Sequence, residues 1–346
     1  MLSTRTEAIL KSVVGRYIAK AKPVASQSLI NDFELRVSSA TIRNEMSQLE
    51  EQGYITRCHP SSGAVPSDKG YRYYVESLGD TKLPPTEQRL IRHLFHQVEG
   101  ELEEWLKLTA NLIAQLVQNM AIVTTPRSAE CRFKRVELIA LQDSLALIIL
   151  VLQGAKIKQQ LTALAQTISQ LELTATANKL NEAYSGLTSS QILAKETVLS
   201  PMEQQITDCL SKIMQAEDEQ EGEELYLNGL HFMLNQPEFA HNQRAQPLME
   251  LVDHRNLLRI IAPQGLSSYK VRVIIGKENE AEVIQDYSIV IGRYGLPEEA
   301  AGTIGIIGPT RMPYARAISS ISYLSSLLSG LVAELYGKEI DQHNTM

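Results

Sequence analysis

Cysteine is scarce in this chain of 346 residues, with three copies, Cys58, Cys131 and Cys209. Their number is odd and they stand far apart, which fits neither a disulfide framework nor a zinc site. We therefore expect structural thiols and no bound metal. His93 and His96 have a helical spacing that suits a metal pair, but neither has a cysteine or an evident carboxylate partner nearby. A solvated helix face is the preferred interpretation of that pair.

The chain also lacks a long hydrophobic segment. Its longest uninterrupted apolar run, Leu145–Leu152, has 8 residues, whereas a membrane-spanning helix needs about 20. The first ten residues, MLSTRTEAIL, contain no apolar stretch of the kind that signal peptides have. We expect a cytoplasmic protein with no membrane partner.

Positive charge is in short supply as well, since the net charge is −7. Such a balance excludes a protein that coats nucleic acid indiscriminately. Residues 1–79 contain ten Lys and Arg and eight Asp and Glu, so the acidic excess lies in the rest of the chain. Non-specific attraction of this segment to DNA is therefore weak, and specificity has to come from contacts to bases.

Catalytic patterns are missing too. Gly302, Gly305 and Gly308 suggest a phosphate-binding loop, but their spacing matches neither of the common phosphate-loop motifs and the expected lysine is absent. Close backbone packing at a strand edge explains them better. No nucleophile–histidine–acid order and no carboxylate pair stands out, so we expect no enzyme and no cofactor.

What the chain does contain is a legible helix at residues 38–53. A serine pair, Ser38 and Ser39, can cap its first turn, and Gly53 can end it. The inward stripe consists of Ile42, Met46 and Leu49, at helical spacing. The opposite face carries Ala40, Arg43, Asn44 and Ser47. Arg bonds guanine and Asn bonds adenine in a DNA major groove, although a solvated helix shows such residues as well.

The flanking segments favour the DNA interpretation. A short apolar helix from Val24 to near Phe33, followed by a turn, precedes this helix as in a helix-turn-helix unit. A β-prone run at 54–57 and a turn at 60–63 predict a two-stranded wing. A supporting helix at 6–17 and a third helix capped by Ser67 complete the predicted domain.

The predicted DNA contacts follow from this geometry. Arg43 and Asn44 are expected to recognise bases, with Ser39, Thr41 and Ser47 at phosphates or base edges. The wing and its surroundings offer Arg57, His59 and Lys69 for the DNA backbone. The alternative role for Arg43 is a salt bridge to Glu7 or to another nearby acid.

The rest of the chain indicates an α+β architecture. Prolines at 84–85 mark a linker, and Thr86 can cap a long helix that reaches about Met120. Three strands are expected between 133 and about 160, then helices from about 165 to 235. Further strands are expected at 269–275, 287–291 and 303–307, before a helix at 313–336. Strands on both sides of a helical block suggest one α+β domain with an inserted helical subdomain.

Several stretches resemble the HrcA family of bacterial heat-inducible transcription repressors. They are SSATIRNEMSQLEEQGYI (38–55), PSDKGYRYYVESL (66–78), LYLNGLHFMLNQPEF (225–239) and GTIGIIGPTRMPYARAISSISYLSSLLS (302–329). One departure concerns the wing, where the family usually has an arginine after the glycine and this chain has Gly63-Ala64. That difference bears on how much the wing contributes to DNA binding.

The resemblance implies a GAF-like sheet domain that is interrupted by a dimerising insertion. The domains are then a winged helix-turn-helix at 1–78, a linker at 79–86, a GAF-like domain at 87–164 and 241–340, and an inserted helical dimerisation subdomain at 165–240. A two-fold dimer predicts an inverted-repeat operator. The resemblance identifies this operator as CIRCE, upstream of chaperone operons, and the chaperonin GroEL as the partner that keeps the repressor active.

A second hypothesis is a ligand-sensing transcription factor. It places a small molecule in the GAF-like domain and predicts a concave pocket with convergent polar groups in 133–160 and 265–310. The sequence singles out no residues for such a pocket.

Overall fold

The structure is a computed structural model that describes residues 2–30, 38–57, 59, 62–98, 101–127, 130–142, 144–153, 157–164, 169–219, 224–239, 271–296 and 300–337. The chain forms two compact units. The main unit comprises residues 1–125, 224–295 and 302–331, and the inserted unit comprises residues 126–223, 296–301 and 332–346. Each unit is described by itself.

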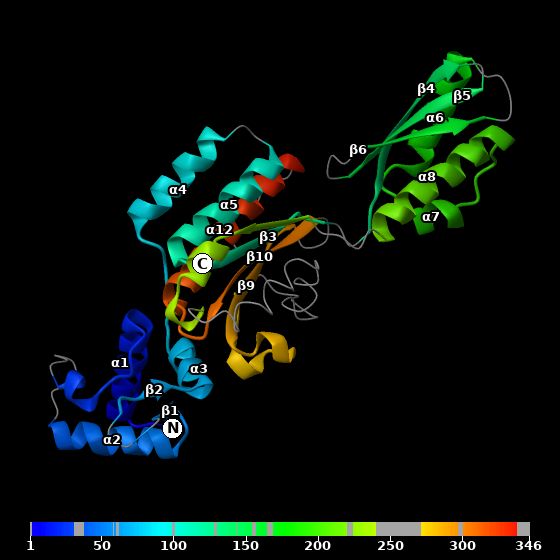
Figure 1. The fold of residues 1–346 in the computed structure, drawn as a ribbon. Helices are drawn as coiled ribbons and strands as arrows, with labels where there is room; N and C mark the ends of the chain where they lie inside the picture. Colours follow the sequence, from blue (N-terminus) through cyan, green and yellow to red (C-terminus); the bar gives the residue numbers. More distant parts are fainter. Residues whose placement is uncertain are drawn as a thin grey trace. The chain divides into compact units, whose positions relative to one another are not determined.

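The main unit begins with an N-terminal domain, residues 2–78, of three α-helices and a two-stranded ribbon (Figure 1). Its elements are α1 (Thr4–Lys20), the 3₁₀ helix η1 (Ser26–Leu29), α2 (Ser39–Glu51), β1 (Ile55–Thr56), β2 (Val65–Pro66) and α3 (Asp68–Glu76). The predicted helices at 6–17 and 38–53 and the helix capped by Ser67 are confirmed. Of the predicted helix at 24–33, η1 is described, and residues 31–37 lie outside the described part.

Apolar burial holds this domain together. The side chains of Ile9, Leu10, Val13, Leu29, Ile42 and Leu49 are all completely buried. Leu29 lies in η1, and the other five recur at helical spacing on α1 and α2, so each of these two helices presents one apolar stripe to the other.

A five-stranded sheet forms the second part of the main unit. Its strand order is β7-β3-β10-β9-β8. The strands are β3 (Met120–Thr124), β7 (Leu225–Asn228), β8 (Arg272–Ile275), β9 (Tyr287–Leu296) and β10 (Ala300–Pro309). Strand β3 pairs antiparallel with both β10 and β7, and β8 pairs antiparallel with β9. We call this part the sheet domain.

Helices cover the sheet domain on one face, and short segments cover the other. Helix α5 (Leu102–Val117) and helix α12 (Tyr314–Leu335) lie side by side, with Arg316 Nε donating to the Leu116 carbonyl at 3.0 Å (Figure 1). The opposite face packs against α9 (Leu230–Leu234) and the 3₁₀ helix η2 (Pro237–Phe239). The short 3₁₀ helices η3 (Gly276–Glu278) and η4 (Glu282–Ile284) lie between β8 and β9.

Helix α12 is the one helix among the described residues that is long and apolar enough to cross a membrane by length and composition. Its side chains at Ala317, Ile321, Leu324, Leu328 and Val332 are completely buried. The apolar spacing of the sequence predicts an inner side made of Ile318, Ile321, Leu324 (or Ser325), Leu328, Leu331 and Leu335. Ile321, Leu324, Ser325 and Leu328 are buried, and Ile318 and Leu331 are half-buried. Leu335 is 47% exposed, so the buried stripe drifts away from that residue by the last turn.

The inserted unit has its own sheet and helices. Strands β4 (Phe133–Gln142), β5 (Leu145–Leu152) and β6 (Ile157–Ala163) form an antiparallel sheet in the order β4-β5-β6. Helices α6 (Gln170–Tyr184), α7 (Ser189–Ala194) and α8 (Pro201–Glu219) follow. Side chains of one sheet face and of these helices share a core that includes Leu138, Ile148, Leu150, Leu180 and Leu210.

The strands at 133–163 therefore differ from our expectation in their partners. We predicted them in the same sheet domain as the late strands, but they form a three-stranded sheet of their own. The inserted unit thus starts near residue 126 rather than 165. The two segments in which a ligand pocket was expected, 133–160 and 265–310, thus contribute their described strands to two different sheets.

Two further strands, β3 and β7, were not predicted from the sequence. Residues 86–120 are not one helix: α4 (Pro85–Gln97) ends where Val98 takes an extended backbone, and β3 begins at Met120. Pro85 is not in the linker but in the first turn of α4, where its missing N–H costs nothing. Strand β7 was predicted as helix because its four residues are too few to show a period.

The glycines of β10 allow close approach, as predicted, but in the middle of the sheet and not at its edge. A Cβ atom at Gly302 would lie 2.5 Å from ring atoms of Tyr294. The Tyr294 hydroxyl in turn donates to the carbonyl of Thr124. The ring is therefore anchored at its hydroxyl end.

Gly302→Ala is expected to lower the free energy of unfolding by about 1–3 kcal/mol, because the methyl group overpacks the Tyr294 ring. Gly330→Ala is the matched control, since a Cβ there meets nothing within 4 Å and Gly330 lies inside α12. It should raise stability by roughly 0.4–1 kcal/mol. Urea denaturation of both variants measures the difference, and equal effects would contradict the packing argument.

A candidate nucleic-acid interface

Helix α2 is oriented by its cap and by its apolar stripe. The Ser38 hydroxyl accepts a hydrogen bond from the Thr41 backbone N–H at 3.2 Å, which starts the helix. Ile42, Met46 and Leu49 are at most 1% exposed. With these three side chains fixed inward, the helical period places the residues between them outward.

The outward face is the predicted one. Ser39, Arg43, Asn44 and Ser47 are exposed. Thr41 is half-buried, and its hydroxyl shares a hydrogen bond of 2.9 Å with the Ser38 hydroxyl. A planar cation and an amide are thus neighbours on a small polar surface, and both can form paired hydrogen bonds to base edges. Contact of these residues with DNA stays a prediction.

The acidic side chains that could form a salt bridge with Arg43 already have other partners. Glu7 pairs with Lys11 at 2.7 Å. Glu45 accepts a hydrogen bond of 2.7 Å from the Thr6 hydroxyl and lies 3.9 Å from Arg5. Within the described part of the chain, Arg43 has no ion-pair partner. Its guanidinium is available to a ligand.

The two-stranded ribbon has the predicted wing position. Ile55 pairs with Pro66, and Thr56 pairs with Val65. Residues 58, 60 and 61 at its turn lie outside the described part, whereas His59 is described and exposed. The Ser62 hydroxyl donates to the His59 carbonyl at 2.7 Å, which closes the turn.

Ala64, where the family usually has an arginine, does not face solvent. Its side chain is completely buried. Its backbone N–H and carbonyl both bond Val24, each at 2.8 Å. A Cβ on the preceding Gly63 would lie 2.5 Å from the Pro23 backbone. This side of the ribbon therefore packs against the domain and presents no cation.

The two other predicted backbone contacts already have partners inside the protein. Arg57 Nε lies 3.5 Å from a Glu50 carboxylate oxygen, and its side chain is 18% exposed. Lys69 Nζ donates to the Gln52 carbonyl at 2.8 Å and lies 4.4 Å from the centroid of the Tyr54 ring. Lys69 thus caps the C-terminal end of α2, where a cation also suits the helix dipole. The sequence did not predict this cap, because Lys69 and Gln52 are 17 residues apart in the chain.

Among the described residues, the cysteines and histidines form no group that could hold a metal ion. The Cys131 thiol donates to the Met214 carbonyl at 3.3 Å, and burial raises its pKa to about 12. Cys209 is buried, and Cys58 lies outside the described residues. His93 bonds Gln97 at 3.0 Å. The described ranges contain no group of three or more side chains that could hold a metal ion.

Ser38→Ala is expected to lower the free energy of unfolding by about 0.5–2 kcal/mol, because the first turn of α2 loses its capping oxygen. Ser39→Ala, one residue away and exposed, is the matched control and should change stability by less than about 0.5 kcal/mol. Thermal denaturation followed by circular dichroism reads both values. Equal losses would mean that Ser38 does not act as the cap.

Comparison with known proteins finds relatives that match nearly the whole chain. Residues 103–318 match the family model described as HrcA protein C terminal domain. A heat-inducible transcription repressor HrcA from Dehalococcoides mccartyi is 54% identical over 338 residues, which cover 98% of each chain. Another, from Roseiflexus castenholzii, is 41% identical over 351 residues, covering 99% of this chain and 98% of the relative.

A solved structure agrees on the fold. It is a crystal structure described as that of a hypothetical protein at 2.2 Å resolution, with a TM-score of 0.59 and 23% identity. The match covers 96% of this chain and 98% of that one. Because the sequence matches extend over nearly all of both chains, this chain belongs to the HrcA family of heat-inducible transcription repressors.

Proposed function

We propose that this protein represses chaperone operons by binding, as a dimer, an inverted repeat of the CIRCE type in cytoplasmic DNA. The observation that carries the proposal is the outward face of α2, where Arg43 and Asn44 are exposed side by side. Family membership adds the class of gene, since the relatives are heat-inducible transcription repressors.

The N-terminal domain is proposed to be a winged helix-turn-helix. Helix α1 supports α2 from behind, η1 precedes α2, and the ribbon β1–β2 supplies the wing. In such domains the helix in the position of α2 enters the major groove. The sheet domain is proposed to be GAF-like, which rests on the family resemblance and on its antiparallel sheet with helices on one face.

The proposed contacts divide into base and backbone contacts. Arg43 and Asn44 read bases, whereas Ser39, Thr41 and Ser47 bind phosphates or base edges. At the wing, His59 is exposed and free to approach the backbone. Lys69 keeps further N–H donors besides the one that it gives to Gln52. Arg57 is the weakest of the proposed contacts because Glu50 already neutralises it.

Dimerisation is proposed to occur through the inserted unit. One face of its sheet is covered by helices, but the opposite face carries apolar side chains that are exposed. They are Ile139 (40%), Ile157 (58%) and Leu161 (58%), and the exposed Leu141 (50%) follows at the irregular end of β4. Leu147, half-buried, pairs with both Ile139 and Leu161 at the centre of this face. A contiguous apolar surface of this kind marks an interaction site, and a second copy is the occupant that an inverted repeat requires.

The proposed regulation works through the active fraction of repressor. GroEL keeps the repressor folded, and heat diverts the chaperonin to other unfolded proteins. A change of about 1.4 kcal/mol in folding free energy alters the folded population about tenfold. A modest loss of chaperonin support is then enough to release the operators.

Fluorescence anisotropy of a labelled CIRCE duplex tests the function at physiological salt, with and without chaperonin. A duplex with both half-sites scrambled is the control. The wild-type protein should bind the repeat at least about 10³-fold more tightly than the scrambled duplex. Equal weak binding to both by a folded dimer would contradict the proposal.

Arg43→Ala should weaken binding to the repeat by about 1–3 kcal/mol and relax the preference for its sequence, because a paired contact to a base is lost. Arg5→Ala is the matched control, since it removes the same charge from an exposed arginine that lies on α1, outside the proposed contacts. It should leave the anisotropy titration unchanged. Unaltered affinity of a dimeric Arg43→Ala protein would rule out α2 as the recognition helix.

Leu161→Asp should convert the dimer to a monomer in sedimentation equilibrium, because it buries a charge in the proposed interface. Val198→Asp controls for the substitution, since Val198 is 93% exposed in the same unit but outside the sheet face. That variant should stay dimeric. A dimeric Leu161→Asp protein would show that the copies meet elsewhere.

A further inference from the structure

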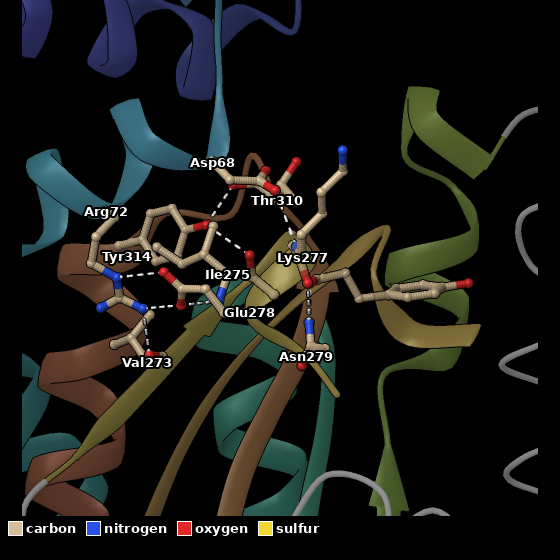
Figure 2. A network of polar contacts seen from close by, with 12 residues as sticks. Asp68, Arg72, Val273, Ile275, Lys277, Glu278, Asn279, Thr310 and Tyr314 are labelled. Atoms are coloured by element: carbon tan, nitrogen blue, oxygen red, sulfur yellow. Dashed lines mark hydrogen bonds and ion pairs between the residues drawn. The ribbon is translucent and has the colours of Figure 1, made fainter. Parts of the chain in front are cut away.

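One side of helix α3 carries a set of polar contacts to the sheet domain (Figure 2). Arg72 Nε donates to a Glu278 carboxylate oxygen at 2.8 Å, and Arg72 Nη2 pairs with the other oxygen of that carboxylate. The same Nη2 also donates to the Val273 carbonyl at 2.8 Å. One guanidinium of the N-terminal domain therefore binds both an acid and a backbone carbonyl of β8 and η3.

Asp68, one turn earlier on α3, completes this contact. Its carboxylate accepts a hydrogen bond from the Lys277 backbone N–H at 3.0 Å (Figure 2). Gly276 has φ +52°, and a Cβ there would overlap the Asp68 carboxylate. The turn is thus shaped to admit this side chain, and only a glycine leaves the space for it.

The turn that contacts α3 is stabilised by hydrogen bonds inside the sheet domain. The buried amide of Asn279 donates to the carbonyls of Gly276, Ile284 and Tyr287, at 2.8, 3.1 and 2.9 Å. Glu278 also accepts from the Ile275 N–H at 2.9 Å. Burial opposes ionisation of Glu278, but the Arg72 and Ile275 hydrogen bonds outweigh it and lower the carboxyl pKa. The acceptor for Arg72 is therefore charged and positioned in advance.

A second anchor joins the same two domains. Arg311, in the loop between β10 and α12, donates to the carbonyl of Ile18 in α1 at 3.0 Å. Its Nη2 bonds Glu238 and Gln236, each at 3.0 Å. Between the anchors the rings of Tyr71 and Tyr314 lie 5.9 Å apart, and both side chains are at most 2% exposed.

We propose that these contacts form an orientation latch, made by Asp68, Arg72 and Arg311, which fixes the DNA-binding domain on the sheet domain in a DNA-competent pose. The outward face of α2 stays exposed while the latch is closed, so docking does not block recognition. The latch uses α1 and α3, which leaves α2 and the wing to the ligand.

The consequence concerns the second half-site and rests on the proposed function. When one domain of a dimer is bound, a fixed pose presents the other recognition helix at the distance and rotation of the second half-site. Linkage of this kind strengthens binding by roughly 10²–10⁴-fold when the geometry matches and is lost when it does not. When the latch is open, each DNA-binding domain is attached through the segment 79–84 alone. The two domains of the dimer then bind their half-sites almost independently.

Arg72→Ala tests the latch without altering the turn that receives it. Lys107→Ala is the matched control, because Lys107 forms ion pairs with Glu103 and Glu104 on α5, outside the latch. Glu278→Ala opens the same contact from the other side. Circular dichroism and sedimentation confirm that each variant is folded and has the wild-type oligomeric state.

The first readout is hydrogen exchange in the full-length protein without DNA. Because the Lys277 N–H donates to Asp68, exchange of the 274–278 segment should speed up at least about tenfold in Arg72→Ala and stay unchanged in Lys107→Ala. Unchanged exchange in Arg72→Ala would overturn the latch. This measurement does not depend on the proposed function.

The second readout compares two duplexes, the CIRCE repeat and the same repeat with about five base pairs, half a helical turn, inserted between the half-sites. The wild type should prefer the unaltered spacing, and Arg72→Ala should reduce this preference about tenfold or more. Faster exchange with an intact spacing preference would overturn the proposed role. A wild type that prefers the repeat no more than a scrambled duplex refutes the proposed function, whatever the exchange shows.

Discussion

The burial of three side chains on α2 is the constraint on which the proposed interface depends. Ile42, Met46 and Leu49 are fixed inward, and a helix has no freedom to rotate about its axis once its apolar stripe is packed. The outward position of Arg43 and Asn44 is thus a packing consequence and needs no contact of their own. Ser38 at one end and Lys69 at the other then set the length of the helix.

Sequence reasoning worked where one short period decided the structure. The stripe of α2, its serine cap and the continuous apolar run of β5 could be read directly because each depends on neighbouring residues alone. It failed where the answer lay in distant contacts. Nothing local tells that β4, β5 and β6 form a separate sheet, or that the four residues of β7 join β3. The pairing partners of a strand are determined by the fold of the whole chain, and the sequence of a single strand does not show which sheet it joins.

The candidate site shows the same division. The exposure of Arg43, Asn44, Ser39 and Ser47 followed from helical geometry. The internal partners of Arg57 and Lys69 did not, because Glu50 and Gln52 approach them through tertiary folding. Ala64 is instructive in another way, since a position that resembled a lost DNA contact is buried against Val24. A residue type identifies a contact only when its direction is known.

The pairing of β3 with β7 has a consequence for how the inserted unit is attached. Ala121 to Thr124 pair with Asn228 to Leu225, and the Thr125 N–H bonds the Glu224 carbonyl at 3.1 Å. The points at which the chain enters and leaves residues 126–223, the largest piece of the inserted unit, are therefore adjacent, like the two ends of a hairpin loop. An insertion closed in this way adds no separation between the strands that flank it. The sheet domain can fold around residues 126–223 as around a tight turn, so this segment is free to change in sequence or size without disturbing the sheet.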